Sequence, residues 1–207
     1  MRKYALGCGA LVILIGLIVL IGGWGSYNRL VGLSQDVDSK WAQVQTDYQR
    51  RYDLIPNLVN TVSGAANFEK STLTEITSAR ASVGQVQVNR NQAPQNQAEL
   101  EQFQRAQDQL SSALSRLLVV VERYPDLKAT SNFRDLQTQL EGTENRIAVA
   151  RRDFNLSVQN YNTAVKRFPT ILFARLLGFP PKPYFQSAAG AEAPPKVQFD
   201  FGKQTNR

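Results

Sequence analysis

The chain contains no histidine and a single cysteine, and both shortages narrow the chemistry that it could carry out. Histidine is the usual general base near neutral pH and a common zinc and haem ligand, so sites of these kinds lose their preferred residue. Cys8 has no second cysteine to pair with, and it lies in an apolar segment where a catalytic thiolate is not expected. The sequence therefore argues against catalysis that depends on histidine or cysteine.

The motifs of common enzyme classes are also missing. No nucleophile-elbow, phosphate-binding, dinucleotide-binding or calcium-loop pattern occurs, and the glycine-rich stretch at 22–25 is typical of a helix exit. Carboxylates occur singly among basic residues, which gives no support for a paired-acid glycosidase or a carboxylate metal cluster. We therefore expect a non-enzymatic protein without cofactor or metal; a hydrolase would need a cleft lined with the few carboxylates.

A long apolar run is present at the N-terminus, from Tyr4 to Ile21. Arg2 and Lys3 precede it and Trp24 follows it, which is typical of a membrane helix with a charged flank and an interfacial aromatic residue. At about 1.5 Å per residue, such a helix covers a hydrocarbon core of roughly 30 Å. We predict that residues 1–25 form a short N-terminal stub and a transmembrane anchor, so that the bilayer is the first partner.

Other interpretations fit this run less well. A cleaved signal peptide would need a shorter apolar core and a small-residue exit, which the Gly-Trp-Gly triplet at 23–25 matches only loosely. A lipoprotein signal would place its cysteine after the apolar core, whereas Cys8 precedes most of it. The basic flank slightly exceeds Arg29 and Lys40 on the far side, which favours a cytoplasmic N-terminus and a main domain outside a bacterial cell membrane.

Composition indicates one hydrophilic domain beyond the anchor. The chain has 207 residues, and its mean hydropathy is −0.31 despite the apolar run. The net charge of +7 permits contact with anionic lipid or nucleic acid without requiring either, because basic and acidic residues are interspersed. We expect other membrane or envelope proteins, or further copies of the chain, as partners, and no nucleic acid.

Apolar residues recur at steps of three and four and predict three long helices. The first begins near Leu30, bends around Pro56 and keeps its pattern to Val83, before an Asn/Gln-rich loop that ends at 97. The second begins after Asn96, whose side chain can cap it while Glu99 reaches back. It stops at the Pro-Asp pair at 125–126.

The third long helix spans about 132–168, and a short fourth at 171–177 is capped by Thr170 and closed by Gly178. The predicted fold is all-α: a transmembrane helix followed by an antiparallel bundle of three long helices and one short helix over residues 26–179, with coiled-coil-like packing. Residues 180–207 are predicted to be a proline-rich extended tail, although 197–201 alternates like a short strand.

Polar residues also recur at helical spacing. Arg50, Asp53 and Asn57 lie on a face opposite the apolar stripe of the first helix, and Glu144, Arg151 and Asn155 flank the stripe of the third. This is either an ordinary solvated face or a set of groups that bond across a helix interface or to a partner. The candidate interaction or structural residues are Arg50, Arg51, Asp53, Asn57, Glu144, Asn145, Arg151, Arg152 and Asn155.

Several motifs at these positions resemble the LemA family of bacterial membrane proteins. They include Asp-Leu-Ile-Pro-Asn at 53–57, Tyr-Pro-Asp-Leu-Lys at 124–128, and Thr-Glu-Asn-Arg-Ile-Ala at 143–148. The resemblance extends from the anchor to Phe201. Phe154 departs from it, since the family usually has tyrosine there, and the loop at 86–97 is peculiar to this chain.

The resemblance implies a single N-terminal anchor and a long helical bundle, and it implies no catalytic residue or cofactor. It associates the family with membrane proteases. The sequence therefore favours a membrane-anchored adaptor or scaffold for envelope proteins, with an accessory factor of a membrane protease as one alternative. A second alternative is a module that binds anionic lipid through basic residues, namely Arg50, Arg51, Arg151, Arg152, Lys166 and Arg167.

Overall fold

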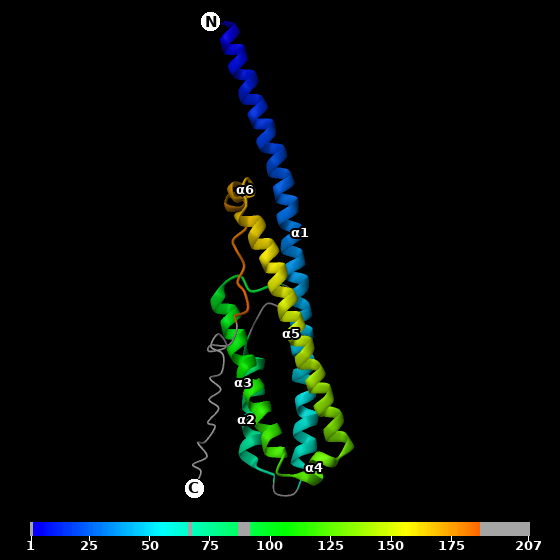
Figure 1. The fold of residues 1–207 in the computed structure, drawn as a ribbon. Coiled ribbons are helices and arrows are strands. Elements are labelled where there is room, and N and C mark those ends of the chain that lie inside the picture. The colour runs from blue at the N-terminus through cyan, green and yellow to red at the C-terminus, as the bar shows by residue number, and fades with distance from the viewer. Residues whose placement is uncertain (1, 66–67, 87–91, 187–207) are drawn as a thin grey trace, which may run out of the picture.

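A computed structural model describes residues 2–65, 68–86 and 92–186, without the side chains of residues 2–15 and 18–20. These ranges contain helices and no strand, which confirms the all-α prediction. The helices are α1 (Arg2–Ser63), α2 (Lys70–Gln85), α3 (Gln97–Val121), α4 (Pro125–Ala129), α5 (Ser131–Lys166) and α6 (Thr170–Leu176). α1 runs the length of the molecule and projects beyond the other helices at its N-terminal end (Figure 1).

The apolar run that begins at Tyr4 forms the projecting part of α1, and the helical backbone continues from it into the bundle without a break. Most of its side chains lie outside the described residues. Within the part of the chain that the structure describes, no helix has a segment long and apolar enough to cross a membrane. The anchor, with its boundaries at Tyr4 and Trp24, therefore stays a prediction.

α1 continues through Pro56 because a second helix supplies the hydrogen bond that proline cannot make. Proline has no backbone N–H, so the carbonyl oxygen of Tyr52, one turn earlier, loses its helical donor. The Nε of Arg80, on α2, donates to this oxygen at 3.4 Å, and the Arg80 guanidinium lies 3.8 Å from the centre of the Tyr52 ring. The expected bend near Pro56 therefore does not divide the helix.

The chain reverses direction after α1, which the sequence did not predict. One continuous helical pattern was expected to Val83, but α1 ends at Ser63 and α2 runs back antiparallel to it (Figure 1). Gly64 lies in the turn, where the backbone N–H of Ala65 donates to the carbonyl of Val62 at 3.1 Å. Both helices bury one face, so apolar residues recur every three or four positions on both sides of the reversal and do not reveal it. The expectation of three long helices and one short helix was wrong in this respect.

The start of α3 confirms the predicted cap. The Asn96 side chain accepts a hydrogen bond from the Glu99 backbone N–H at 2.9 Å, and the Glu99 carboxylate accepts one from Asn96 Nδ2 at 2.7 Å. At the other end, α3 stops before Pro125 as expected. Pro125 then begins the short helix α4. Proline suits this position because the backbone N–H of a first helical residue has no partner within the helix, so its loss costs nothing.

Gly178 closes α6 as predicted, and Thr170 does not open it. Gly178 has a φ of +74°, and the following N–H, of Phe179, donates to the Ala174 carbonyl at 2.9 Å, which completes a glycine-type helix end. Thr170 is instead the first helical residue and is buried, with Pro169 at the cap position. Because Pro169 and not Thr170 occupies the cap position, this part of the prediction was wrong.

The buried apolar side chains form two clusters along the bundle. The proximal core, nearer the projecting end, consists of Leu30, Val37, Trp41, Val44, Tyr48, Ala93, Leu100, Phe103, Ile147, Ala150, Phe154, Val158, Tyr161, Ala164, Val165, Ala174 and Phe185. The distal core consists of Ile55, Leu58, Val62, Phe68, Ile76, Ala79, Leu110, Ala113, Leu114, Leu117, Val121, Leu127, Phe133 and Leu140. α1, α3 and α5 contribute to both cores, whereas α2 contributes only to the distal one.

Residues 180–186, which we call the strap, follow α6 and form no helix or strand. They run back from α6 toward the beginning of α3 (Figure 1). Phe185 of the strap is part of the proximal core. The rest of the tail, including the strand-like stretch at 197–201, lies outside the described residues.

Candidate functional site

Arg51 is the most deeply buried charged side chain in the described part of the chain, with 1% of its surface exposed. Its Nη1 donates to the Glu144 carboxylate at 2.9 Å and to the Ser111 hydroxyl at 2.8 Å. Its Nη2 donates to both the side-chain and the backbone oxygen of Gln107. One arginine of α1 therefore joins α3 and α5 through a shared set of hydrogen bonds.

This network separates the two cores. Arg51 lies between Tyr48 of the proximal core and Ile55 of the distal core, and Gln107 lies between Phe103 and Leu110 in the same way. We call Arg51, Gln107, Ser111 and Glu144 the polar layer. We therefore expect the polar layer to fix the register of the packed helices more than it adds stability.

Nearby groups feel both the burial and the charge of the layer. The Arg51 guanidinium lies 4.9 Å from the centre of the Tyr48 ring. Burial raises the pKa of the Tyr48 phenol, and the positive charges of Arg151 and Arg51 partly oppose this. Glu144 keeps 45% of its side chain exposed, so water reaches its carboxylate and weakens the ion pair. Solvent therefore reaches the polar layer at Glu144 and not at Arg51.

The strap is held on α5 by two asparagines that each make a pair of hydrogen bonds with its backbone. Asn162 donates to the Lys182 carbonyl and accepts from the Lys182 N–H, both at 2.8 Å. Asn155 donates to the Phe185 carbonyl at 3.1 Å and accepts from the Phe185 N–H at 2.9 Å. Each primary amide therefore pairs with a peptide group as a neighbouring β-strand would.

Side chains of the strap complete its attachment. The Lys182 ammonium is buried and lies 3.1 Å from the Asp38 carboxylate, which also accepts a hydrogen bond from the Ala93 N–H at 2.9 Å. Phe185 packs on Trp41, and the Arg151 guanidinium lies over the outer face of its ring at 4.6 Å. Asp38 therefore connects α1, the segment before α3 and the strap.

A groove of about 1050 Å³ lies between α1 and the helices α2 and α3. Its apolar lining includes Tyr48, Phe103 and Val83, and exposed polar side chains of α1 stand at its edge. The full lining is Ala42, Gln45, Thr46, Tyr48, Gln49, Arg50, Tyr52, Asp53, Leu54, Asn57, Val83, Gly84, Val86, Phe103 and Gln107. Predicted interaction residues of α1 therefore border a concave surface.

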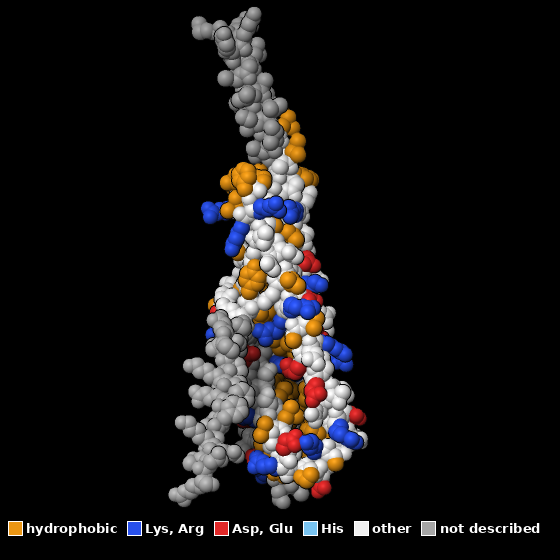
Figure 2. Space-filling model, in the orientation of Figure 1, with side chains coloured by type: hydrophobic (Ala, Val, Ile, Leu, Met, Phe, Trp, Pro, Cys, Tyr) orange, Lys and Arg blue, Asp and Glu red, His pale blue; other side chains and the backbone are white. Residues whose placement is uncertain are grey.

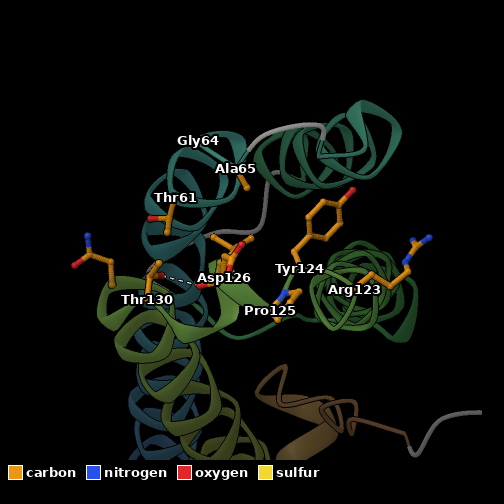
Figure 3. A pocket seen from close by; sticks show the side chains of 10 residues that line it. Thr61, Gly64, Ala65, Arg123, Tyr124, Pro125, Asp126 and Thr130 are labelled. Carbon is orange, nitrogen blue, oxygen red and sulfur yellow. Dashed lines mark hydrogen bonds between the residues drawn. The ribbon is translucent and has the colours of Figure 1, made fainter.

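A second pocket, of about 610 Å³, lies at the distal tip of the bundle. Figure 3 shows it between Thr61 and Gly64 at the end of α1 and the residues around α4, which include Tyr124, Asp126 and Thr130. Thr130 also caps α5, since its Oγ1 accepts a hydrogen bond at 3.4 Å from the backbone N–H of Phe133, the third residue of the helix. The tip pocket thus includes residues of the Tyr-Pro-Asp-Leu-Lys motif.

The structure distributes the predicted polar residues over three places. Arg51 and Glu144 meet in the polar layer, Arg151 and Asn155 hold the strap, and the other three α1 residues border the groove. Asn145 and Arg152 are exposed, and Arg152 contacts the adjacent Asp153. Because Arg51 is buried and Arg151 covers Phe185, the basic residues proposed for lipid binding do not form one exposed face.

Some residues of these sites were not identified from the sequence. Gln107 and Ser111 had one usable signal, because Gln107 occupies an apolar position in the stripe of α3, between Phe103 and Leu110. Arg51, which the sequence did identify, likewise lies three residues after Tyr48 and four before Ile55. Asp38 and Lys182 had no such signal, since they meet across 144 positions of the chain.

Comparisons with known proteins show which sequences resemble this chain. Magnetosome protein MamQ 2 of Paramagnetospirillum magneticum is 28% identical over 187 residues, which cover 81% of this chain and 67% of that protein. Magnetosome protein MamQ of Magnetospirillum gryphiswaldense is 26% identical over the same shares. Protein LemA of Metamycoplasma hominis is 25% identical over 153 residues, which cover 74% of this chain and 65% of that protein.

The sequence pattern of the LemA family matches residues 40–199, a range that includes the polar layer, the groove, the tip pocket and the strap. The chain therefore belongs to the LemA family.

Proposed function

We propose that this protein is a single-pass membrane protein that acts as a non-enzymatic adaptor or scaffold for envelope proteins. In this proposal residues 4–24 cross the bacterial cell membrane, and the bundle lies outside the cytoplasm. The continuity of α1 supports it, because a helix without a break between the apolar run and the bundle would hold the bundle at a fixed angle to the bilayer. A bundle held in this way presents its long faces to neighbouring proteins.

The groove beside α1 is the observation that carries the adaptor role. It combines an apolar lining, with Tyr48 and Phe103 buried beneath it, with an edge made by the exposed side chains of Arg50, Asp53 and Asn57. Protein interfaces have this organisation, with an apolar centre surrounded by a polar rim. A helix or extended segment of a partner could place apolar side chains in the groove and bond to the rim.

The test compares two matched double variants of the full chain. Arg50→Ala with Asn57→Ala removes two rim groups of the groove, and Arg152→Ala with Asn160→Ala removes the same residue types from the exposed face of α5. Partners are recovered from detergent-solubilised native membranes, identified by mass spectrometry, and then bound again as purified proteins. The groove variant should weaken binding about tenfold or more, because it removes two polar groups that hydrogen-bond to the partner in this proposal, each worth about 1 kcal/mol.

Stability measurements distinguish docking from folding. All four residues are exposed, so neither double variant should change the free energy of unfolding by more than about 0.5 kcal/mol per residue. Equal affinity of both variants for the same purified partner would contradict docking in this groove. Release of the wild-type protein from membranes by carbonate would contradict the anchor.

A further inference from the structure

The proximal end of the molecule exposes apolar side chains on two adjacent helices. On α6 and just before it, Phe168, Leu172 and Leu176 are exposed by 76%, 62% and 83%. On α1, Ile21 and Trp24 are exposed by 68% and 75%. Figure 2 shows apolar side chains gathered where α1 leaves the bundle. Elsewhere in the described ranges, large exposed apolar residues are scattered singly, at Val119, Val149, Leu156 and Tyr184.

α6 is fixed against α1 immediately after the apolar run. A Cβ atom on Gly23 would lie 3.2 Å from Cε1 of Phe173, so glycine at this position lets α6 approach the helix closely. A little further along α1, the Tyr27 ring meets the ring of Phe179 edge to face, with centroids 5.8 Å apart. The two contacts place the exposed leucines of α6 beside the first residues after Ile21.

The charges at this end have one sign. Residues 1–35 and 154–186 contain no aspartate or glutamate. Arg29, Lys166, Arg167 and Arg175 are exposed there and form no ion pair with a described residue. In Figure 2 basic side chains lie directly below the apolar group, on the side of the bundle. An apolar surface bordered by basic side chains is the pattern of a segment that lies in the interface of a membrane with anionic lipids.

We propose that Phe168, Leu172, Leu176 and Leu177 form a foot that lies in the headgroup region of an anionic bilayer. The apolar side chains enter the boundary of the acyl chains, while Lys166, Arg167 and Arg175 contact lipid phosphates. The inference rests on the proposed anchor, because the apolar run of α1 brings the foot to the membrane surface. Together, anchor and foot make two contacts with the bilayer and fix the tilt of the bundle.

The experiment measures the depth of single fluorescent labels on the full chain in vesicles of phosphatidylcholine and phosphatidylglycerol. In a Cys8→Ser background, three single-cysteine variants are labelled with a nitrobenzoxadiazole dye: Leu176→Cys on the foot, Val119→Cys on α3, and Val12→Cys in the apolar run. Val119 is the matched control, since it is 71% exposed and belongs to the distal half of α3. Lipids with spin labels at shallow or deep positions quench only dyes at those depths.

We expect shallow spin labels to quench the dye at 176 several times more strongly than the dye at 119, and deep spin labels to quench the dye at 12. Equal, weak quenching at 176 and 119 would overturn the foot, provided that the dye at 12 is quenched. Absence of quenching at 12 would instead show that the anchor itself fails. A dye at 176 that is shielded from aqueous iodide but not quenched by lipid would show a protein contact, including one with a second copy, and would also overturn the foot.

Charge neutralisation tests the choice of lipid. The triple change Lys166→Gln, Arg167→Gln and Arg175→Gln should reduce shallow quenching at 176 in the mixed vesicles. When the three basic residues are kept, vesicles of phosphatidylcholine alone should reduce the shallow quenching at 176 to a similar extent. Quenching at 176 that responds to neither change would contradict a role for anionic lipid.

Discussion

The proximal and distal cores use the same two helices, α1 and α5, but different segments complete them. In the distal core α2 and α3 pack against α1 and α5, and all four segments are regular helices. In the proximal core, α3 contributes only its first turns, and the strap and α6 cover the remaining side. The comparison shows that one bundle can be closed by regular helices in one half and by an extended segment with a short helix in the other.

The cores also differ in the kind of side chain that fills them. Trp41 lies at the centre of an aromatic group in the proximal core, with ring centroids 5.2 Å from Phe103, 5.6 Å from Phe154 and 6.1 Å from Phe185. The distal core is mostly aliphatic, with leucine on every long helix except α2. Large flat rings suit the gap beside an irregular strap, whereas leucines suit the regular ridges of packed helices.

The largest expected effect comes from removing the centre of the aromatic group. Trp41→Ala should lower the free energy of unfolding by about 4 kcal/mol, because it deletes a fully buried indole and leaves a cavity. Urea denaturation of the detergent-solubilised chain, followed by circular dichroism at 222 nm, measures it. Trp24→Ala is the control and should cost less than about 0.5 kcal/mol, since Trp24 is exposed. Equal losses for the two tryptophans would show that the proximal core is not a stable unit.

The next effect concerns the boundary between the cores. Arg51→Ala should lower the free energy of unfolding by about 3 kcal/mol, because it leaves Gln107 and Ser111 without their partner in a buried layer. Glu144→Gln should cost less than about 1 kcal/mol, because the glutamate is partly exposed and the amide can still accept a hydrogen bond. Thermal denaturation of both variants tests the ranking. A larger loss for Glu144→Gln would reverse our assignment of the arginine as the central group.

A smaller and local effect is expected at the strap. Asn162→Ala or Asn155→Ala should cost about 1 to 2 kcal/mol each, because each removes two hydrogen bonds to the backbone. Hydrogen exchange should accelerate at the amides of Lys182 and Phe185 and stay unchanged in the distal core. Asn160→Ala, on the exposed side of α5, serves as the control. Unchanged exchange at the strap would mean that its apolar contacts alone hold it.

The smallest effect is a loss of stability in alkali that is specific to the proximal core. Burial raises the pKa of Tyr48 above 10.0, and burial together with the negative charge of Asp38 raises that of Tyr161. The unfolded chain therefore loses these protons first, so their contribution to stability is present below pH 10 and is lost as the pH rises through the folded pKa values. Tyr48→Phe with Tyr161→Phe should flatten this loss in unfolding experiments between neutral and alkaline pH. A loss of the same steepness in the double variant would assign it to other groups.

The sequence was sufficient for features that depend on local chemistry. The Asn96 cap, the glycine end of α6 and the apolar stripes each follow from a few neighbouring residues, and the structure confirms them. The reversal after Ser63 was missed because periodicity identifies a buried face without stating which helix it meets. Local sequence also could not identify the donor that compensates for Pro56, since Arg80 comes from a different helix.

The candidate site was predicted only in part, because residue spacing does not state which helix or segment a side chain meets. Spacing singled out all four of Asp53, Asn57, Glu144 and Asn155 without deciding between a solvated face and a bonding set. In the structure Asp53 and Asn57 are exposed, whereas Glu144 and Asn155 bond to other segments. It could not tell that the carboxylate of Glu144 meets Arg51 rather than Arg151, because the choice depends on how α1 and α5 are rotated against each other. The binding of the strap had no periodic signal, since an extended segment that pairs with asparagine amides needs no regular side-chain pattern.

The contact between Asp38 and Lys182 has a consequence for the order in which the protein is made. The two residues are 144 positions apart, and the wall of the proximal core is finished by Phe185, which is translated after all the helices. A ribosome that has released α1 to α5 has delivered every element of the distal core but not the last side of the proximal one. Contacts over such a separation form slowly. The proximal core, although its α1 residues are made before those of the distal core, is therefore the last to close.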